Sequence, residues 1–481
     1  MAERMLKFVV VDRRTPEKRD VEERAGDFHE IYRDFIDAKA AEQASRCSQC
    51  GVPFCQTHCP LHNNIPDWLK MTAEGRLQEA YVLSAQTSSL PEVCGRICPQ
   101  DRLCEGGCVI EQSGHGTVTI GAVERYINDK AWEMGWVEPV RVGPDQGRSV
   151  GIIGAGPAGV SAAERLRERG YAVTIYDRHD RPGGLMTYGI PGFKLEKDVV
   201  ERRVRRLADS GIAFVTDFEV GRDATLAELR ERHDAVLIAT GVYKARDLSI
   251  PGVGSEGVIA ALDFLTASNR VGLGDAVPAF DNGALNAAGK DVVVIGGGDT
   301  AMDCVRTAIR QGASSVTCLY RRDRFNMPGS LREVANAEEE GVRFEWLAAP
   351  KAVLGEAAGV SGVRAVRMRL GAPGSDGRHA PEEVPGSEFD APAQMVIKAL
   401  GFDPEDLPAL FAEPALKVSC WGTVRTDFRT LMTDLPGVFA AGDIVRGASL
   451  VVWAIRDGFD AATSIHHYLQ AATRPALIAA E

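Results

Sequence analysis

Eight cysteines attract attention because they are concentrated in one short segment. The chain has eleven cysteines, and eight of them lie between positions 47 and 108. In a reducing compartment, thiols gathered in this way indicate metal ligation rather than disulfides. The eight are Cys47, Cys50, Cys55, Cys59, Cys94, Cys98, Cys104 and Cys108. Eight thiolates match the needs of two sites with four ligands each.

Spacing alone leaves three interpretations of this group open. Zinc ribbons also contain Cys-x2-Cys, but their two pairs are spaced differently. Cys59 and Cys98 are each followed by proline, which is typical of proteins with two clusters, in which the closing cysteine binds the other cluster. We therefore expect two 4Fe-4S clusters, with structural zinc and unligated thiols as the alternatives.

A glycine-rich turn after an apolar run at 150–153 indicates a second kind of chemistry. The turn reads G-x-G-x-x-G, with Gly154, Gly156 and Gly159. These glycines permit a tight turn, the approach of a pyrophosphate to the backbone and close packing of helix on strand. Asp177 follows at the distance where an acid hydrogen-bonds an adenosine ribose. We expect a dinucleotide here; the alternative is a glycine-rich turn without a ligand.

A second turn after 291–295 repeats this arrangement. It contains Gly296, Gly298, Asp299, Thr300 and Ala301, which fit the permitted variant G-x-G-x-x-A. Arg321 and Arg322 stand at the end of its second strand, where an acid would meet a free 2'-hydroxyl. Guanidinium groups suit a 2'-phosphate, so this turn is expected to prefer NADP(H) to NAD(H). A solvated basic strand end is the alternative.

Two such turns in one chain indicate two nucleotides that exchange a hydride, most simply FAD at the first turn and NADPH at the second. Two segments, one containing Thr240 and one containing Gly442 and Asp443, resemble those of two-dinucleotide flavoprotein reductases, in which the aspartate holds the ribityl-phosphate region. For Asp443 a plain helix cap is the alternative. Gly184 and Leu185 complete the cofactor-binding candidates. No catalytic side chain is expected, because hydride transfer between cofactors needs no protein nucleophile.

The elements that must position these residues follow from the apolar pattern. Strands are expected at 150–153, 172–176, 235–239, 291–295, 315–320, 395–399 and 437–441. Helical patterns occur between them and at 67–80, while 354–394 is expected to hold surface hairpins and loops. Alternating strands and helices predict parallel sheets. The expected fold class is α/β, with two Rossmann-like dinucleotide-binding domains preceded by an all-helical iron–sulfur domain.

The order of these motifs predicts an interrupted domain. We expect a helical domain at 1–146 and a discontinuous FAD-binding domain at 147–247 and 398–481. An NADPH-binding domain at 248–397 would be inserted into it. The boundary near 147 rests on the polar Gly- and Pro-containing segment 142–148.

Composition limits the classes of partner. The chain has 481 residues, a formal net charge of -12 and an ordinary apolar content of 45%. The negative charge disfavours a nucleic-acid-binding surface. No apolar stretch is long enough for a membrane span or a signal peptide, so a cytoplasmic protein is expected. Neither nucleotide domain contains Cys-x-x-C, which disfavours a disulfide reductase, and Cys304 and Cys318 are expected to be buried apolar residues.

The whole chain resembles the small (beta) subunit of bacterial NADPH-dependent glutamate synthase. The residues that carry the resemblance are the two fingerprint turns and the segments 27–32, 44–55, 59–66, 189–194, 441–443 and 450–455. The resemblance implies that NADPH reduces FAD and that electrons pass through the clusters to FMN in a separate large (alpha) subunit, which makes glutamate from glutamine and 2-oxoglutarate.

The resemblance also implies how the thiols are divided. Cys47, Cys50 and Cys55 would share one cluster with Cys108, and Cys59, Cys94, Cys98 and Cys104 would hold the other. A related enzyme, dihydropyrimidine dehydrogenase, has a glutamine at one ligand of the second cluster, so Cys94 is the ligand in question. Two other functions compete with this one. They are a related reductase that serves ferredoxin or a pyrimidine-reducing partner, and a non-catalytic assembly module.

Overall fold

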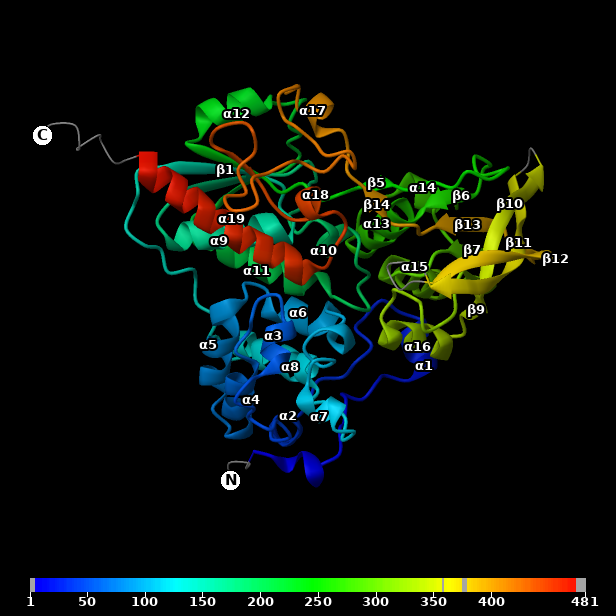
Figure 1. Cartoon of the computed structure of the whole chain (residues 1–481), viewed down its shortest axis with the longest axis horizontal. Helices are drawn as coiled ribbons and strands as arrows, with labels where there is room; N and C mark the ends of the chain where they lie inside the picture. Colours follow the sequence, from blue (N-terminus) through cyan, green and yellow to red (C-terminus); the bar gives the residue numbers. More distant parts are fainter. Residues whose placement is uncertain (1–4, 357–358, 374–378, 473–481) are drawn as a thin grey trace, which may run out of the picture.

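The computed structural model describes residues 5–356, 359–373 and 379–472 (Figure 1). An N-terminal helical module, blue to cyan in Figure 1, lies against two parallel sheets that are flanked by helices. The expected α/β fold with a preceding helical domain is therefore confirmed.

The helical module is built from short helices that pack around buried apolar side chains, among them Trp68 and Ile127. Its helices are α1 (Val21–Ala25), α2 (Asp37–Ala44), α3 (Phe54–His58), α4 (Ile65–Ala73), α5 (Leu77–Thr87), α6 (Pro91–Ile97), α7 (Val109–Gln112) and α8 (Ile120–Glu133), with 3-10 turns at Lys7–Val9 and Gln100–Arg102. The helices are short because prolines and cysteine-bearing turns interrupt them.

The helix expected at 67–80 is wrong as a single element. The structure divides it into α4 and α5. Gly75 lies between them at φ +77°, and the N–H of Arg76 donates to the carbonyl of Met71. This left-handed glycine with its backward hydrogen bond ends α4 as in a Schellman motif. The apolar periodicity continues across the break, which is why the pattern alone predicted one helix.

The first sheet has five parallel strands in the order β15-β4-β1-β2-β3. These strands are β1 (Ser149–Ile153), β2 (Ala172–Tyr176), β3 (Ala213–Val215), β4 (Ala235–Ile238) and β15 (Val438–Ala440). Its helices are α9 (Pro157–Glu168), α10 (Leu185–Tyr188), α11 (Lys197–Asp209), α12 (Leu226–Arg232), α17 (Leu407–Leu410), α18 (Asp443–Arg446) and α19 (Val451–Ala472). We call this sheet with its helices the first unit.

The second sheet also has five parallel strands, in the order β6-β13-β7-β8-β9. These strands are β6 (Val258–Ala260), β7 (Asp291–Ile295), β8 (Ser315–Tyr320), β9 (Arg343–Trp346) and β13 (Met395–Lys398). Its helices are α13 (Ala261–Gly272), α14 (Pro278–Asp281), α15 (Asp299–Arg310) and α16 (Leu331–Glu339). We call it the second unit, and in the sequence it lies between β4 and β15 of the first unit.

Two smaller sheets complete the fold. The segment expected to contain hairpins forms an antiparallel sheet of β10 (Ala348–Glu356), β11 (Gly359–Pro373) and β12 (His379–Pro392). A two-stranded ribbon of β5 (Lys244–Ala245) and β14 (Phe402–Asp403) pairs the chain where it leaves the first unit with the chain where it returns. The pairing of β5 with β14 thus brings together the two ends of the segment that forms the second unit.

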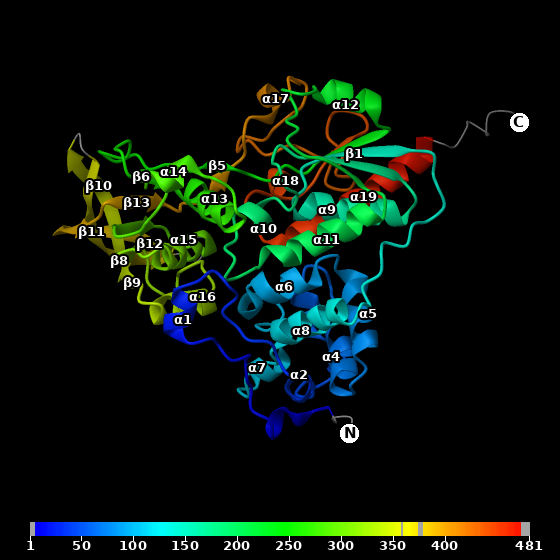
Figure 2. The same cartoon turned by 180° about the vertical axis from the view of Figure 1, so that it is seen from behind.

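The three parts contact one another directly. Viewed from behind, α6 of the helical module lies beneath α11 of the first unit, and α1 lies beside α16 of the second (Figure 2). Between the helical module and the first unit, the hydroxyls of Ser89 and Ser161 are 2.7 Å apart and buried. The helical module therefore touches both nucleotide units.

Candidate functional site

In the first unit, the turn between β1 and α9 has the geometry that its three glycines predict. Gly154 has φ +110°, and a Cβ there would lie 2.4 Å from the carbonyl oxygen of Ala239. A Cβ on Gly159 would lie 2.0 Å from the carbonyl oxygen of Gly154, whereas a Cβ on Gly156 would meet nothing within 4 Å. The first and third glycines are thus required by the fold, and the second leaves open space above the start of a helix, where an anion binds well.

Asp177 lies at the end of β2, against this turn. Its carboxylate accepts hydrogen bonds from the N–H groups of Ala155, at 2.6 Å, and His179, at 2.9 Å. His179 and Tyr243 line the same cavity as Gly154, Asp177 and Thr240. Sequence reasoning missed these two rings, although each stands within three residues of a predicted site residue.

Thr240 has a buried hydroxyl that tests whether a polar group fits this cavity. Its hydroxyl oxygen is buried and has no hydrogen-bond partner among the residues that the structure describes. An unpaired buried polar atom is costly in a folded protein. A group with polar atoms is therefore expected to fill this cavity, which a dinucleotide would do.

The segment containing Gly184 and Leu185 closes over the turn from the other side. Gly184 has φ +56°, and a Cβ there would lie 2.9 Å from the Cα of Gly156. The N–H of Gly183 donates to the carbonyl of Ala155. Leu185 begins α10. Lys197 holds this segment, because its ammonium group donates to the backbone carbonyls of Met186, at 3.1 Å, and Ile190.

Gly442 and Asp443 follow β15 and reach the start of α9. Gly442 has φ +79°, and a Cβ there would lie 2.9 Å from the side chain of Ala158. Asp443 is the first residue of α18, and no side chain caps this helix. Burial raises the pKa of the Asp443 carboxyl to about 6. The backbone of Ser449 hydrogen-bonds to this carboxyl, which follows Gly442 beside the start of α9.

The turn of the second unit repeats these constraints. Gly296 has φ +150°, and a Cβ there would lie 2.2 Å from the carbonyl oxygen of Ala399, whereas one on Gly298 would meet nothing within 4 Å. Asp299 accepts a hydrogen bond from the N–H of Ser330 at 2.9 Å. Thr300 and Ala301 continue into α15, and Ala301 is buried.

Arg321 and Arg322 follow β8, as expected, but their side chains differ in exposure and in hydrogen bonding. Arg321 is exposed, while Arg322 is partly buried and donates through Nε to the carbonyl of His379 at 3.2 Å. Cys318 lies in β8, three residues before Arg321, and its side chain is on the buried face. Its thiol donates to the carbonyl of Gly296 at 3.3 Å. Cys304 and Cys318 are both buried, as predicted, and burial raises the pKa of both thiols.

The eight clustered cysteines line two separate cavities. Cys47, Cys50, Cys55 and Cys108 line the first, together with Pro53 and Phe54. Cys59, Cys94, Cys98 and Cys104 line the second, together with Val452 of α19 in the first unit. We call these the first cage and the second cage. The spacing of the cysteines gave no means of assigning Cys108 to the first group, because it is the last of the eight in the sequence.

Gln100 also lines the second cage, but both ends of its amide are engaged. Its nitrogen donates to the carbonyls of Cys94 and Gly95, and its oxygen accepts from Arg332. Cys94 lines the same cavity as Cys59, Cys98 and Cys104.

The thiols are the potential metal ligands of the two cages. Within the described ranges, no group of three or more His, Cys, Asp or Glu side chains is placed to hold a single metal ion. All eleven cysteines are free thiols, and burial raises the pKa of Cys47 to about 11 and of Cys55 to about 12. A bound metal deprotonates such thiols outright.

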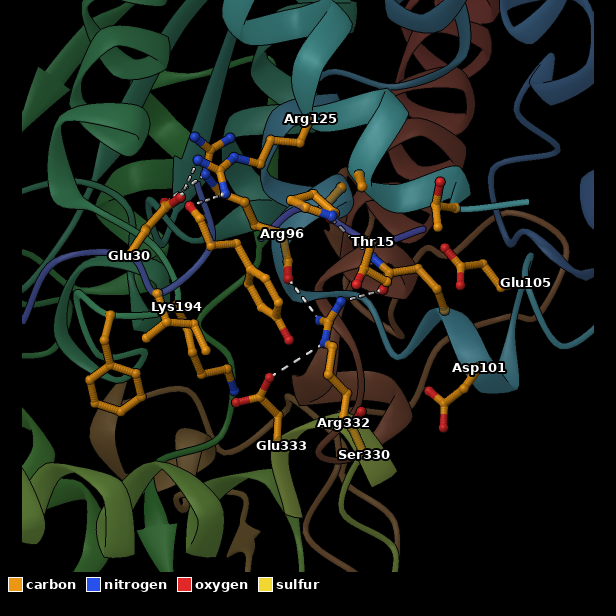
Figure 3. Close-up of a pocket in the computed structure, with 18 of the residues that line it drawn as sticks. Thr15, Glu30, Arg96, Asp101, Glu105, Arg125, Lys194, Ser330, Arg332 and Glu333 are labelled. Carbon is orange, nitrogen blue, oxygen red and sulfur yellow. Dashed lines mark hydrogen bonds and ion pairs between the residues drawn. The ribbon is translucent and has the colours of Figure 1, made fainter. Parts of the chain in front are cut away.

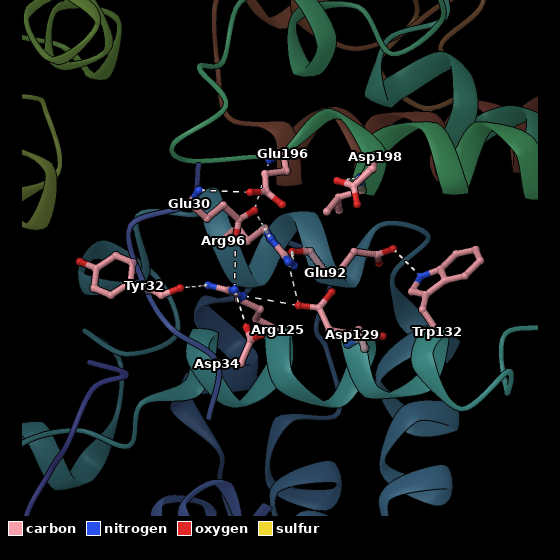
Figure 4. Close-up of polar contacts among 12 residues, drawn as sticks. Glu30, Tyr32, Asp34, Glu92, Arg96, Arg125, Asp129, Trp132, Glu196 and Asp198 are labelled. Carbon is pink, nitrogen blue, oxygen red and sulfur yellow. Dashed lines mark hydrogen bonds and ion pairs between the residues drawn. The ribbon is translucent and has the colours of Figure 1, made fainter. Parts of the chain in front are cut away.

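A buried ion pair joins the helical module to the first unit, and a network of charged residues within the module lies beside it (Figure 4). The guanidinium of Arg203, on α11, binds both carboxylate oxygens of Glu92, on α6, at 2.6 and 2.7 Å. The indole N–H of Trp132 donates to the same carboxylate at 2.9 Å. Nearby, Arg96 pairs with Glu30 and Asp129. Charge pairs that are buried and multiply hydrogen-bonded define one docking geometry.

The segment 189–194 fixes the first unit on the second. The ammonium of Lys194 pairs with Asp303 of α15 at 2.8 Å. The ring of Phe193 lies beneath the guanidinium groups of Arg306 and Arg310, with 4.4 and 4.0 Å to the ring centre. Cation–π contacts and a buried ion pair thus join this short segment of the first unit to α15 of the second unit.

No helix in the described part of the chain combines the length and apolar composition needed to cross a membrane.

Two family models match this chain. Residues 24–136 match the family model described as dihydropyrimidine dehydrogenase domain II, 4Fe-4S cluster. Residues 148–458 match the model of pyridine nucleotide-disulphide oxidoreductases. The first match covers all eight clustered cysteines, and the second covers both glycine-rich turns.

Relatives and solved structures point in the same direction. FprA of Mycobacterium tuberculosis, solved in complex with NADPH, shares the fold, with a TM-score of 0.57 and 23% identity, covering 68% of this chain and 85% of FprA. The glutamate synthase (NADPH) small chain of Azospirillum brasilense is 66% identical over 480 residues, 100% of this chain and 99% of its own length. That of Escherichia coli K12 is 46% identical over 98% of this chain and 100% of its own length.

These matches establish an NADPH-dependent oxidoreductase that carries flavin and iron–sulfur chemistry. The chain belongs to the family of the glutamate synthase (NADPH) small chain.

Proposed function

We propose that this chain is the electron-input subunit of a glutamate synthase. It oxidises NADPH by hydride transfer to FAD and passes electrons through two 4Fe-4S clusters to the FMN of a large (alpha) subunit, which makes glutamate from glutamine and 2-oxoglutarate. The observation that carries the proposal is the presence, in one chain, of two four-thiol cages and two open phosphate-binding turns, with one cage in contact with the first unit.

We assign FAD to the first unit, residues 147–247 and 398–481. Gly154, Gly156 and Gly159 would admit the pyrophosphate, and Asp177 would accept from a ribose hydroxyl. The rest of the site would be lined by the unpaired hydroxyl of Thr240, the segment at Gly184 and Leu185 that closes over the turn, and the carboxyl of Asp443 beyond Gly442. β15 completes this sheet from the far side of the insertion, which is why the domain is divided in the sequence.

We assign NADPH to the second unit, residues 248–397, where the sheet extends one residue further, to Lys398 at the end of β13. Gly296, Gly298 and the start of α15, with Asp299, Thr300 and Ala301, would hold the pyrophosphate. The exposed Arg321, with Arg322 beside it, would bind the 2'-phosphate.

We assign one cluster to each cage. Cys47, Cys50, Cys55 and Cys108 would bind the first, and Cys59, Cys94, Cys98 and Cys104 the second. Val452 of α19 borders the second cage, whereas the helical module alone supplies the lining of the first. Phe54 and Val109, which also line the first cage, are 45% and 38% exposed. The second cage is therefore placed to receive electrons from the flavin side, and the first to deliver them to a partner at the surface.

Reconstitution with a bacterial glutamate synthase large subunit tests the function. The purified chain is expected to contain FAD and about eight iron and eight sulfide, and its flavin spectrum is expected to bleach with NADPH. Addition of the large subunit, glutamine and 2-oxoglutarate is expected to give NADPH-dependent glutamate. NADPH oxidation by a soluble dye without any glutamate formation would instead favour a reductase with another partner. A zinc-containing chain without iron would overturn the cluster assignment.

Matched cysteine variants test the order of the cages. Cys50→Ala is expected to abolish glutamate formation while NADPH still reduces the flavin, with iron content reduced by about half. Cys420→Ala changes an exposed cysteine outside both cages and is expected to leave iron and activity unchanged. Glutamate formation at the wild-type rate by Cys50→Ala would remove the first cage from the path.

A further inference from the structure

A cavity lies where the helical module meets both nucleotide units (Figure 3). Gly95 and Gln100 line it from the helical module, Phe193 and Lys194 from the first unit, and Ser330 and Arg332 from the second. Along this junction two arginines cross in opposite directions. Arg102 reaches from the helical module into the second unit, and Arg332 reaches back.

Arg102 lies between two ligand candidates of the second cage, Cys98 and Cys104, at the end of the 3-10 turn Gln100–Arg102. Its guanidinium donates to three consecutive backbone carbonyls of the second unit. These belong to Met327, at 3.1 Å, Pro328, and Gly329, at 2.8 Å. One side chain thereby fixes the path of a whole turn.

That turn supports the phosphate-binding loop of the second unit. The N–H of Gly329 donates to the carbonyl of Gly297 at 2.8 Å, and the N–H of Ser330 donates to the carboxylate of Asp299 at 2.9 Å. Gly297 and Asp299 stand on either side of Gly298, the glycine that leaves open space for the pyrophosphate. A displacement of residues 327–330 would therefore move the loop itself.

Arg332 makes the return connection. From the first turn of α16, its Nη1 donates to Gln100 Oε1 at 2.9 Å, and its Nη2 donates to the carbonyl of Arg96 at 3.0 Å. Gln100 in turn donates to the carbonyls of Cys94 and Gly95. The backbone that carries the second cage and the loop at Gly298 are thus joined by two independent sets of hydrogen bonds.

We propose that Arg102 and Arg332 are positioning residues for the nucleotide of the second unit, through which the segment of the second cage sets the shape of the NADPH-binding loop. This inference rests on the proposed assignment of NADPH to the second unit. Hydrogen bonds from a charged donor are stronger than neutral ones. Because binding couplings are reciprocal, the nucleotide is also expected to alter the environment of the second cage.

The test compares NADP+ binding in Arg102→Gln, Arg332→Gln and wild type by calorimetric titration of the full chain with its cofactors. Each variant is expected to bind NADP+ about tenfold more weakly, a difference of about 1.4 kcal/mol, with wild-type FAD and iron content. In a dye-coupled assay KM for NADPH is expected to rise about tenfold, while kcat stays within twofold. Arg102→Lys, which keeps the charge but loses the fork, is expected to recover part of the affinity.

Arg205→Gln is the matched control, because Arg205 is an exposed arginine that pairs with Glu201 within α11; it is expected to bind NADP+ as wild type does. Iron content is measured in both variants, because Arg102 lies between two cysteines of the second cage and Arg332 donates to Gln100, which lines that cage. A second measurement is the EPR spectrum of the reduced clusters, which NADP+ is expected to shift in wild type but not in Arg102→Gln.

The outcomes separate the two proposals. If wild type does not bind NADP+, the assignment of the second unit is wrong. If wild type binds and both glutamine variants bind equally well, the assignment stands and the positioning role is overturned. Weaker binding accompanied by loss of iron in both variants would also overturn it, because the effect would then come from damage to the cages.

Discussion

The two nucleotide units share one design and differ in what surrounds it. Each has a strand, a glycine-rich turn and a helix, and in each the second glycine faces open space. In the first unit, the strand-end residue Asp177 is buried and bonded to its own turn. In the second, Tyr320 occupies the equivalent position at the end of β8, and the exposed Arg321 follows it. Under the proposed assignments, the common part would bind a pyrophosphate, and the differing part would distinguish one nucleotide from the other.

The units also differ in how the segment beside the turn is held. In the first, Lys197 binds the carbonyls of Met186 and Ile190 from within the same unit. In the second, Arg102 binds the neighbouring turn from the helical module. A tightly held resident cofactor is suited by an internal clamp. If the second unit binds NADPH as proposed, the clamp from the helical module would tie the nucleotide site to the module proposed to carry the clusters.

The largest expected effect comes from substituting Gly156 and Gly298, the glycines that face open space in the two units. Gly156→Ala and Gly298→Ala each add a methyl group where the structure leaves space, at extended backbone that any residue adopts. Stability is expected to be unchanged, because only a pyrophosphate would contact the methyl. Gly156→Ala is expected to lower FAD content at least tenfold and activity with it. Gly298→Ala is expected to keep FAD and raise KM for NADPH at least tenfold.

Gly272→Ala is the control for both, since a Cβ there also meets nothing within 4 Å and the site lies at the end of α13. Flavin absorbance, thermal unfolding and dye-coupled kinetics measure the three effects. Loss of FAD in Gly298→Ala with retention in Gly156→Ala would reverse the assignment of the units.

The next largest effect is expected from removing the positive charges of Arg321 and Arg322. Arg321→Gln with Arg322→Gln removes the guanidinium groups proposed to bind the 2'-phosphate. KM for NADPH is expected to rise about tenfold or more, while KM for NADH changes less than twofold. Steady-state kinetics with both nucleotides measure the ratio. An equal loss with NADH would show that the arginines act on a feature common to both nucleotides.

How much of the two units could be predicted from the sequence depends on how far apart in the sequence the contacting residues lie. The strands, the turns and the arginines after β8 follow from local patterns, and the structure has a strand at each expected place. The break at Gly75 was missed because the apolar pattern does not reveal where a residue adopts left-handed backbone angles. The contact of Arg102 with Met327 spans 225 positions, and the position of Cys108 beside Cys47 likewise depends on how helices pack. Such docking is fixed by burial and charge pairing between modules, for which no local pattern exists.

A pH-dependent effect follows from the internal clamp. Burial lowers the pKa of Lys197 to about 7, below its value of about 10.4 in an unfolded chain. The unfolded state therefore binds more protons between these values, and the group makes the folded state more stable as the pH rises from 7 toward 10. Lys197→Met removes this dependence. Between pH 7.5 and 8.5, the free energy of unfolding of wild type is expected to gain about 1 kcal/mol relative to the variant.

Denaturant unfolding at the two pH values measures this difference, and other titrating groups cancel because both proteins contain them. Parallel pH profiles would show that Lys197 stays charged and solvated. The same comparison with Arg102→Gln is expected to show no such divergence, because an arginine does not lose its proton in this range.

The smallest effect concerns equivalent positions beneath the two turns. Cys318 pairs with Val294 in β7 and β8 as Ile175 pairs with Ile152 in β1 and β2, and both are buried. Cys318 also donates a weak hydrogen bond to Gly296.

If that bond shaped the turn, Cys318→Ala would raise KM for NADPH. The crowding of Gly296 against Ala399 is the stronger constraint, so KM is expected to change less than twofold and stability to fall by about 1 kcal/mol. Ile175→Ala removes more buried volume and is expected to cost about 2–4 kcal/mol. A tenfold rise in KM for Cys318→Ala would mean that the second turn, unlike the first, depends on the side chain beneath it.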